Sequence, residues 1–388
     1  MGRDSLHTTL ARHVERGDVP GVVALVARGD DVHVETIGHR AVGDSEPIGR
    51  DTIFRIASLT KPIAGVAAML LVEDGLMTLA DPVARWLPEL AEPRVLRSVD
   101  ADLDDTVPAR RPITVEDVLS FHLGWGSVMA PPDTYPIQRA EAALDLKTFG
   151  PPWPPSELTP GEWIAALGTL PLLDQPGSNW RYAGGAQVAG VLVERVAGAP
   201  IAEVLRERVF EPLGMVDTGF FVPADTRHRF ATQYVPDPVT GVLRVLDRPD
   251  GWWSVPPKMP DVNGWLVSTV DDLWAFASMM AAGGGDLLSP ESVRLMLIDR
   301  MTAEERLANR IFVGDHSGWG LMMAVPAADG STGIPGGFGW EGGTGTSWRT
   351  DPAVGLTGIL LTQRAMISPE PPEIVSDFWT AAYAAVAS

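Results

Sequence analysis

A serine and a lysine three residues apart carry the strongest chemical signal in the sequence. They stand in the run Ser58-Leu59-Thr60-Lys61, and on a helix this spacing brings both side chains onto one face, one turn apart. A buried lysine can lose its proton and act as a base, which would make the neighbouring hydroxyl a nucleophile. The same pattern also fits a serine helix cap beside an unrelated lysine, so other residues must decide between these interpretations.

The residues around this pair predict a helix that would hold it. Ser58 would lie at the N-terminus of that helix, where free N–H groups and the helix dipole favour a developing anion, and Gly75 is placed to end it. Only three of the 30 basic residues are lysines, so Lys61 stands out in a chain that otherwise uses arginine for its cations. Apolar residues recur at the spacing of an amphipathic helix at Ile63, Val66, Ala67, Leu70 and Leu71.

Composition bounds the class of protein. The 388 residues, 45% hydrophobic and 21% charged, are typical of a globular chain with one large domain or two packed ones. A net charge of −20 argues against nucleic acid or an anionic membrane as partner, because both need clustered cations. There is no cysteine, which excludes disulfides, zinc–thiolate sites and a cysteine nucleophile. No secretion signal is visible, since the start reads as an amphipathic helix over 6–16, so we expect a cytoplasmic protein.

The order of elements predicts an α/β (α+β) fold. Runs 21–28 and 32–38 form a predicted β-hairpin near the start, and 346–350 with 356–362 form another near the end, followed by a helix over 372–386. The pattern predicts an antiparallel sheet built from both chain ends and flanked by helices, with 1–80 and 214–388 as the α/β domain. Between them, 81–213 reads as a mostly helical domain, with helix starts at Thr114 and Thr159 and a stiff proline loop over 151–155.

Two more segments offer chemistry. The run 176–185 puts Tyr182, one of four tyrosines, on a glycine-rich turn before a helix, where a rigid hydroxyl could relay protons. The run 336–348 is dense in glycine and leads into a strand, and glycine lets backbone approach a ligand closely. Taken singly, the tyrosine equally suits the core and the glycines suit a flexible turn.

With these three segments in order, the chain resembles the serine β-lactamase and penicillin-binding-protein superfamily, above all family VIII carboxylesterases and class C β-lactamases. Ser58-Leu59-Thr60-Lys61 fits the S-x-x-K box. Tyr182-Ala183-Gly184 stands where these enzymes carry a tyrosine triplet, and Trp340-Glu341-Gly342 where they carry Lys-Thr-Gly, His-x-Gly or Trp-x-Gly. The resemblance covers nearly the whole chain and implies a β-lactamase/transpeptidase-like fold.

The resemblance also implies roles for single residues. Ser58 would be the nucleophile, Lys61 and Tyr182 the acid–base pair, and the N–H groups of Ser58 and Gly343 the oxyanion site. No cofactor or metal is needed. The expected partner is a small-molecule ester, and the oligomeric state is not readable from the sequence.

Two departures from the family pattern bear on the substrate. The tyrosine triplet ends in Gly184 instead of a small polar residue, so one hydrogen bond is absent or comes from elsewhere. The third box has Trp340 in place of a cation, which favours neutral esters over β-lactams, with Glu341 and Gly342 beside it at the substrate. Amide hydrolysis, β-lactam hydrolysis and acyl transfer stay open on the same site, as does a non-catalytic binding protein of the same fold.

Remaining signals are weaker. Trp125 and Trp253 are candidates to line an aromatic substrate pocket, although core packing is the alternative for each. The run 337–342 matches G-x-G-x-x-G but precedes a strand, so we interpret it as a false dinucleotide fingerprint. His122, His228 and His316 lack metal-ligand spacing, and we predict no metal site.

Overall fold

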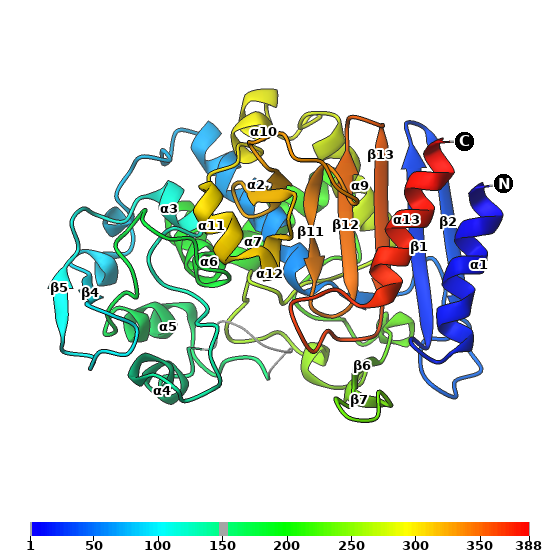
Figure 1. Ribbon diagram of the computed structural model, residues 1–388, viewed down its shortest axis with the longest axis horizontal. Helices are drawn as coiled ribbons and strands as arrows, with labels where there is room; N and C mark the ends of the chain where they lie inside the picture. Colours follow the sequence, from blue (N-terminus) through cyan, green and yellow to red (C-terminus); the bar gives the residue numbers. More distant parts are fainter. Residues whose placement is uncertain (1, 147–153, 388) are drawn as a thin grey trace.

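A seven-stranded antiparallel sheet forms the centre of the protein (Figure 1). The computed structural model describes residues 2–146 and 154–387, so most of the predicted proline loop lies outside the described residues. The strand order is β2-β1-β13-β12-β11-β10-β9. The bounds are Gly21–Arg28 (β1), Asp31–Gly38 (β2), Ser317–Trp319 (β9), Ala324–Pro326 (β10), Phe338–Gly342 (β11), Thr346–Asp351 (β12) and Leu356–Thr362 (β13). The predicted sheet from both chain ends is therefore confirmed.

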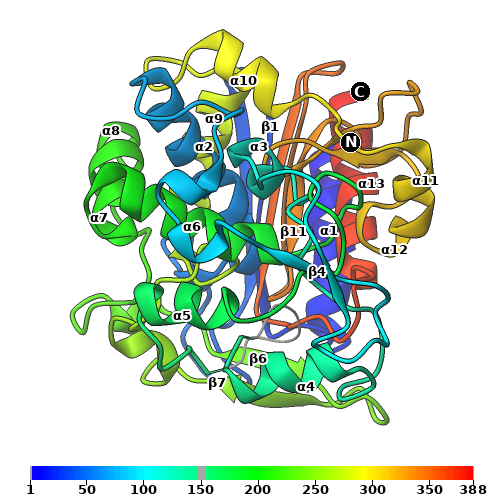
Figure 2. The same cartoon turned by 90° about the vertical axis from the view of Figure 1, so that its left-hand side faces the viewer.

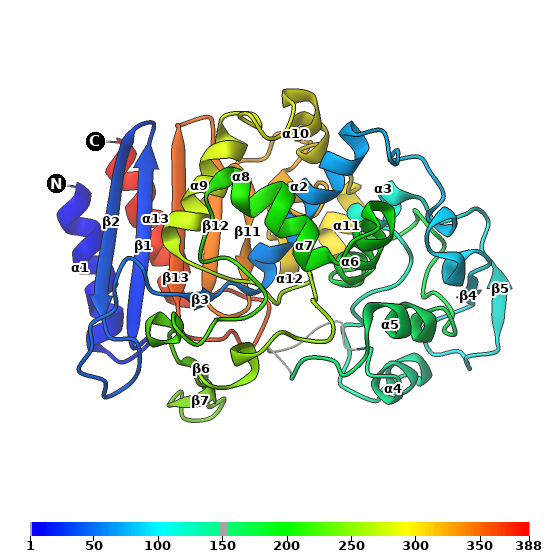
Figure 3. The ribbon, with the colours of Figure 1, turned by 180° about the vertical axis from the view of Figure 1, so that it is seen from behind.

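The alternation of side chains along β1 gives the sheet two buried faces. Val23 and Leu25 point into the main core, whereas Val22 and Ala24 join a second core under the terminal helices. These helices are α1 (Gly2–Glu15) and α13 (Glu373–Ala387), which lie side by side over that face. Helix α9 (Val270–Ala281) covers the opposite face, as the view from behind shows (Figure 3). Both faces are covered, so β13 is buried along its whole length and β1 is buried up to its last residue, Arg28.

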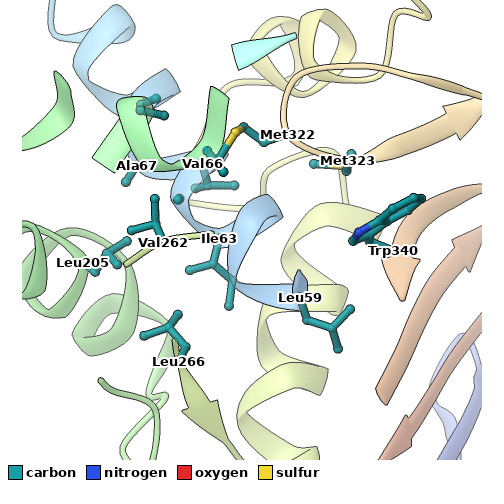
Figure 4. Packing of buried hydrophobic residues seen from close by; sticks show 14 of the residues in the cluster. Leu59, Ile63, Val66, Ala67, Leu205, Val262, Leu266, Met322, Met323 and Trp340 are labelled. Atoms are coloured by element: carbon teal, nitrogen blue, oxygen red, sulfur yellow. The ribbon is translucent and has the colours of Figure 1, made fainter. Parts of the chain in front are cut away.

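The helix after Ser58 is confirmed, but its surroundings differ from the expectation. It is α2 (Thr60–Glu73), and Gly75 follows its end with a positive φ of 71°. The sequence indicated a helix with one apolar stripe, whereas α2 is buried on all sides over 60–71. The reason is that α6 (Gly184–Ala197) and α7 (Ile201–Leu205) pack on one side while Met322 packs on the other (Figure 4).

The middle of the chain is mostly helical and lies to the left of the sheet in Figure 1, so it stands in front of the sheet in Figure 2. Thr114 and Thr159 both form capping boxes, which confirms the two predicted helix starts. A short hairpin of β4 and β5, which the sequence did not indicate, also lies here. One hydrophobic core continues across this region into the sheet, and the division at 81 and 213 stays a prediction. The elements are Val83–Arg85 (η2), Pro88–Leu90 (η3), Arg94–Leu96 (β4), Thr106–Pro108 (β5), Val115–Leu119 (α3), Pro136–Ala143 (α4), Pro160–Leu167 (α5), α6, α7, Arg206–Phe210 (η4) and Glu211–Leu213 (α8).

Short elements complete the framework around Ser58. Two strand pairs, β3 with β8 and β6 with β7, lie outside the main sheet. Within the described parts of the chain, no helix is long and apolar enough to cross a membrane. The remaining elements are Phe54–Arg55 (β3), Ala57–Leu59 (η1), Arg227–Arg229 (η5), Gln233–Pro236 (β6), Leu243–Asp247 (β7), Trp252–Ser254 (η6), Val267–Ser268 (β8), Pro290–Met296 (α10), Ala303–Ala308 (α11) and Arg310–Val313 (α12).

Candidate active site

Two distant segments of the sequence meet at one hydroxyl, that of Ser58. The Ser58 Oγ lies 2.7 Å from Lys61 Nζ and 2.9 Å from the Tyr182 hydroxyl. Ser58 stands on the 3₁₀ turn η1 just before α2, Lys61 on the first turn of α2, and Tyr182 just before α6. The structure thus brings together the serine, lysine and tyrosine that the sequence singled out, with the lysine and the tyrosine each in hydrogen-bonding distance of the serine.

The turn that carries Ser58 is held by hydroxyl groups on both sides. Ala57 has a positive φ of 43°, which costs free energy for a residue with a Cβ and so needs support from its surroundings. Thr60 Oγ1 donates to the Ala57 carbonyl at 2.6 Å. Thr344 and Thr346, after β11, donate to the carbonyls of Arg55 and of the residue after it. Neither threonine was assigned from the sequence, because each donates to a main-chain carbonyl of a segment almost 300 residues away.

Lys61 is buried and surrounded by neutral hydrogen-bond partners. Its side chain is 1% exposed, and Nζ donates to the Asn263 carbonyl as well as contacting Ser58. Burial lowers the pKa of Lys61 to about 7, and the negative charge of Asp261 offsets only part of this effect. The tyrosine triplet ends in Gly184, which has no side chain to bond to the lysine. The Asn263 carbonyl accepts a hydrogen bond from Lys61 instead.

A turn between residues 261 and 264 presents that carbonyl to Lys61. Asp261 accepts hydrogen bonds from the Asn263 N–H at 2.8 Å and from Gln187 Nε2 at 3.1 Å. Asp261 and Asn263 were not singled out from the sequence. The local signal was the Asp-Val-Asn-Gly run itself, because an aspartate two residues before an amide N–H is typical of an Asx turn.

Tyr182 is fixed through both its backbone and its ring. Ser127 donates from its N–H and its Oγ to the Tyr182 carbonyl, at 2.9 and 3.0 Å. Ala183 follows with a φ of 75°, which turns the chain into α6. The Tyr182 ring stacks on Phe312 with a centroid distance of 4.8 Å. Burial raises the pKa of Tyr182 to about 12, so its hydroxyl keeps its proton at neutral pH.

The third box lies along β11 beside Tyr182. Trp340 is 3% exposed, and its Nε1–H donates to the Tyr182 hydroxyl at 2.7 Å. The single polar group of the indole therefore serves the tyrosine. Glu341 lines the cavity and pairs with Arg349 at 3.1 Å. A Cβ on Gly342 would lie 2.4 Å from the carbonyl oxygen of Ile56, so this position needs glycine to pass the Ser58 turn.

An open cavity of about 560 Å³ lies against these groups. Ser58, Lys61, Tyr182, Trp340 and Gly343 all line it, and a Cβ on Gly343 would meet no atom within 4 Å. Its volume lies in the range of drug-sized ligand sites. The walls away from Ser58 are largely apolar and come from Val235, Pro236, Phe312, Met366, Ile367 and Pro371.

A cation also borders this cavity, at its outer part. Arg244 on β7 lines it, with its side chain 71% exposed and paired to Asp237 at 2.6 Å. Arg244 was not assigned a role from the sequence, because the β6–β7 pairing brings it here. The charge of Asp237 cancels that of Arg244, so this pair adds no net positive charge to the rim of the cavity.

The two candidate pocket tryptophans lie elsewhere, which corrects the sequence interpretation. Trp125 is fully buried and donates from Nε1 to Glu141 at 2.6 Å. Trp253 is 1% exposed, stacks on Trp265 at 3.8 Å and donates to its carbonyl. Each indole has a buried partner for its N–H, so both are core residues with no surface on the cavity.

Comparison with known proteins places the chain in a family. The solved structure of EstCE1, described as a hydrolase with promiscuous acyltransferase activity, superimposes with a TM-score of 0.81 at 25% identity and covers 98% of both chains. The fold is thus the β-lactamase/transpeptidase-like fold. A sequence model described as Beta-lactamase matches residues 6–373, and the chain belongs to this family.

Curated relatives match over similar lengths. Protein Rv1367c of Mycobacterium tuberculosis is 38% identical over 378 residues, which span 94% of this chain and 90% of that protein. Esterase EstB of Burkholderia gladioli is 33% identical over 371 residues, spanning 89% of this chain and 86% of EstB. Relatives of this fold thus include esterases and an acyl-transferring hydrolase, which supports an enzyme of serine hydrolase or acyltransferase type.

Proposed function

We propose that this protein is a carboxylesterase that cleaves neutral carboxylic esters through an acyl-enzyme on Ser58. One observation carries the proposal: the Ser58 hydroxyl lies between a lysine whose pKa is near 7 and a tyrosine that keeps its proton, at an apolar-walled cavity. A nucleophile with a base and an acid each within 3 Å of it is what acyl transfer needs.

Acylation starts at Lys61. In its neutral form, Nζ donates to the Asn263 carbonyl and accepts the Ser58 proton at 2.7 Å. The Ser58 Oγ then forms a bond to the ester carbonyl carbon, and the carbonyl oxygen takes the negative charge. By the family resemblance, the N–H groups of Ser58 and Gly343 hold that oxyanion.

The leaving alcohol takes its proton from Tyr182. The C–O bond of the ester breaks, the alkoxide accepts the phenol proton, and Lys61 returns a proton to the tyrosine, whose ring centroid is 4.8 Å from Nζ. Trp340 stabilises the phenolate meanwhile, because its N–H donates to the same oxygen. Water then attacks the acyl group and gives up a proton to Lys61. The bond from the acyl carbon to the Ser58 Oγ breaks, the acid leaves, and Lys61 returns that proton to the Ser58 Oγ.

Neutral esters suit this cavity better than β-lactams. A β-lactam carries a carboxylate, and the indole at position 340 offers it no cation while its N–H already bonds to Tyr182. Arg244 at the rim is paired with Asp237. The name of EstB also supports an esterase, and the description of EstCE1 supports a hydrolase. Acyl transfer would use the same acyl-enzyme, with an added alcohol in place of water.

The test compares two chromogenic substrates and labels the nucleophile. We expect kcat/KM for p-nitrophenyl butyrate to exceed that for nitrocefin by about 10²-fold or more. A fluorophosphonate probe should add its mass to Ser58, and Ser58→Ala should lower kcat by roughly 10³-fold or more. Labelling of another serine, or equal turnover of nitrocefin, would overturn the assignment.

A further inference from the structure

Glu305 on α11 is a carboxylate that four donors share. Its Oε2 accepts from the N–H and the hydroxyl of Thr302, at 2.8 and 2.9 Å, which caps α11. Its Oε1 accepts from the Trp180 N–H at 3.1 Å and from His122 Nε2 at 3.2 Å. The side chain is only 11% exposed. One oxygen therefore serves the helix itself, while the other crosses to the segment that leads to Tyr182.

The two segments that Glu305 joins both support Tyr182. Trp180 lies two residues before Tyr182 on the same segment. Helix α11 continues into α12, which carries Phe312 onto the Tyr182 ring at 4.8 Å and 27° between ring planes. In Figures 1 and 2, α11 and α12 lie together beside the edge of the sheet. The Glu305 carboxylate thus connects two supports of the tyrosine, its preceding backbone and its stacking partner.

The charge of Glu305 is required for this arrangement. Burial would raise the pKa of Glu305, but the hydrogen bonds from His122 and Thr302 outweigh it and hold the pKa below its usual value. His122 Nδ1 faces the Ser120 carbonyl and hydroxyl, both at 3.0 Å. Because a carboxylate only accepts, the His122 imidazole donates from Nε2 to Glu305. An amide at position 305 has one acceptor oxygen and cannot serve both Thr302 and Trp180.

We propose that Glu305 is a positioning residue that holds Tyr182 at the Ser58 hydroxyl through Trp180 and Phe312. This rests on the proposed function, in which Tyr182 protonates the leaving alcohol. A proton donor must lie within hydrogen-bond reach of the oxygen it protonates, so a small displacement of the phenol slows that step most. Glu305 itself is not among the described residues that line the cavity.

The leaving group separates this role from a general loss of structure. A p-nitrophenolate leaves as a stable anion and hardly needs a proton, whereas an ethoxide needs one. Ethyl butyrate and p-nitrophenyl butyrate share the acyl group, and kcat/KM reports acylation for both. A displaced Tyr182 should therefore slow the ethyl ester far more than the nitrophenyl ester, while partial unfolding slows both by the same factor.

The experiment uses Glu305→Gln with Glu304→Gln as the matched control. Glu304 is the exposed neighbour on the same helix, so its change removes one negative charge and leaves the contacts of Glu305 in place. We expect Glu305→Gln to lower kcat/KM for ethyl butyrate by about 10-fold or more and for p-nitrophenyl butyrate by less than about 3-fold. Glu304→Gln should change neither value by more than about 2-fold.

A second variant guards against a folding defect. Phe312→Leu keeps Glu305 and its cap but removes the ring that stacks on Tyr182, and it should show the same preference for the nitrophenyl ester. Equal losses on both esters, or no loss in Glu305→Gln, would overturn the positioning role. Failure of the proposed function would differ, because Ser58→Ala would then keep its activity on both esters.

Discussion

Arg55 and Lys61 are two buried cations six residues apart, and their surroundings are opposite. Both side chains are 1% exposed. Arg55 donates to the Asp247 carboxylate and to two backbone carbonyls, and its guanidinium lies over the Phe230 ring at 3.9 Å. Lys61 donates to a neutral hydroxyl and a carbonyl, with Asp261 acting only as a nearby charge.

The comparison shows how one segment keeps one cation and neutralises another. Burial lowers the pKa of Arg55 to about 10, so it stays charged at neutral pH, in contact with its counter-ion. Burial lowers the pKa of Lys61 to about 7, where it loses its proton readily. Arginine therefore fits the structural role beside Ser58, and lysine fits the role of a base.

Replacing Lys61 should have the largest effect, and the effect should be on activity. Lys61→Arg keeps a charge at position 61 but removes a group that can take the Ser58 proton at neutral pH. We expect kcat for p-nitrophenyl butyrate to fall by roughly 10³-fold or more, with an unchanged circular dichroism spectrum. A variant that keeps more than about a tenth of wild-type kcat would mean that Lys61 supplies charge only.

Removing the charge of Asp247, the counter-ion of Arg55, should lower the stability of the fold. Asp247→Asn leaves Arg55 buried without its anion, and breaking such a pair typically costs about 3–5 kcal/mol. Urea unfolding at pH 7 should show a fall of roughly 3 kcal/mol in the free energy of unfolding. No measurable loss would mean that the carbonyls and the Phe230 ring are enough for Arg55.

Replacing Lys61 with an apolar residue should raise the free energy of unfolding, which is the opposite of the effect expected at Asp247. The folded-state pKa of Lys61, about 7, lies below its ordinary value of 10.5, so between these pH values the unfolded chain binds a proton that the folded chain does not. Stability from this group therefore rises with pH across that window, and at pH 7 its burial costs about 4 kcal/mol. Lys61→Met removes this cost, but it also loses two hydrogen bonds, which offset part of the gain. We therefore expect the free energy of unfolding to rise by roughly 2 kcal/mol. A less stable variant would contradict the account.

Local patterns in the sequence were enough for the sheet from both chain ends and for the Ser58–Lys61 pair, because strand and helix periodicity decides which neighbouring side chains share a face. Tyr182 and the third box were placed beside Ser58 only by the family resemblance. Local geometry could not have done so, since Tyr182 lies 124 residues from Ser58 in the sequence.

The rest of the site depends on contacts between distant segments. Asn263, Arg244, Phe312 and Glu305 reach their places through turns and packing that no local period marks, so they were not assigned. The prediction that Trp125 and Trp253 line the pocket was wrong for the same reason. Composition alone does not distinguish an indole in the core from one in a pocket wall.

The pH dependence of kcat/KM for p-nitrophenyl butyrate tests the central claim, that neutral Lys61 is the base for Ser58. The neutral fraction of Lys61 rises as the pH rises through its pKa, so activity must rise with it. We expect an acid limb with an apparent pKa of about 7, below which kcat/KM falls about tenfold per pH unit. A flat profile between pH 5 and pH 8, in an enzyme that stays folded over this range, would contradict the account.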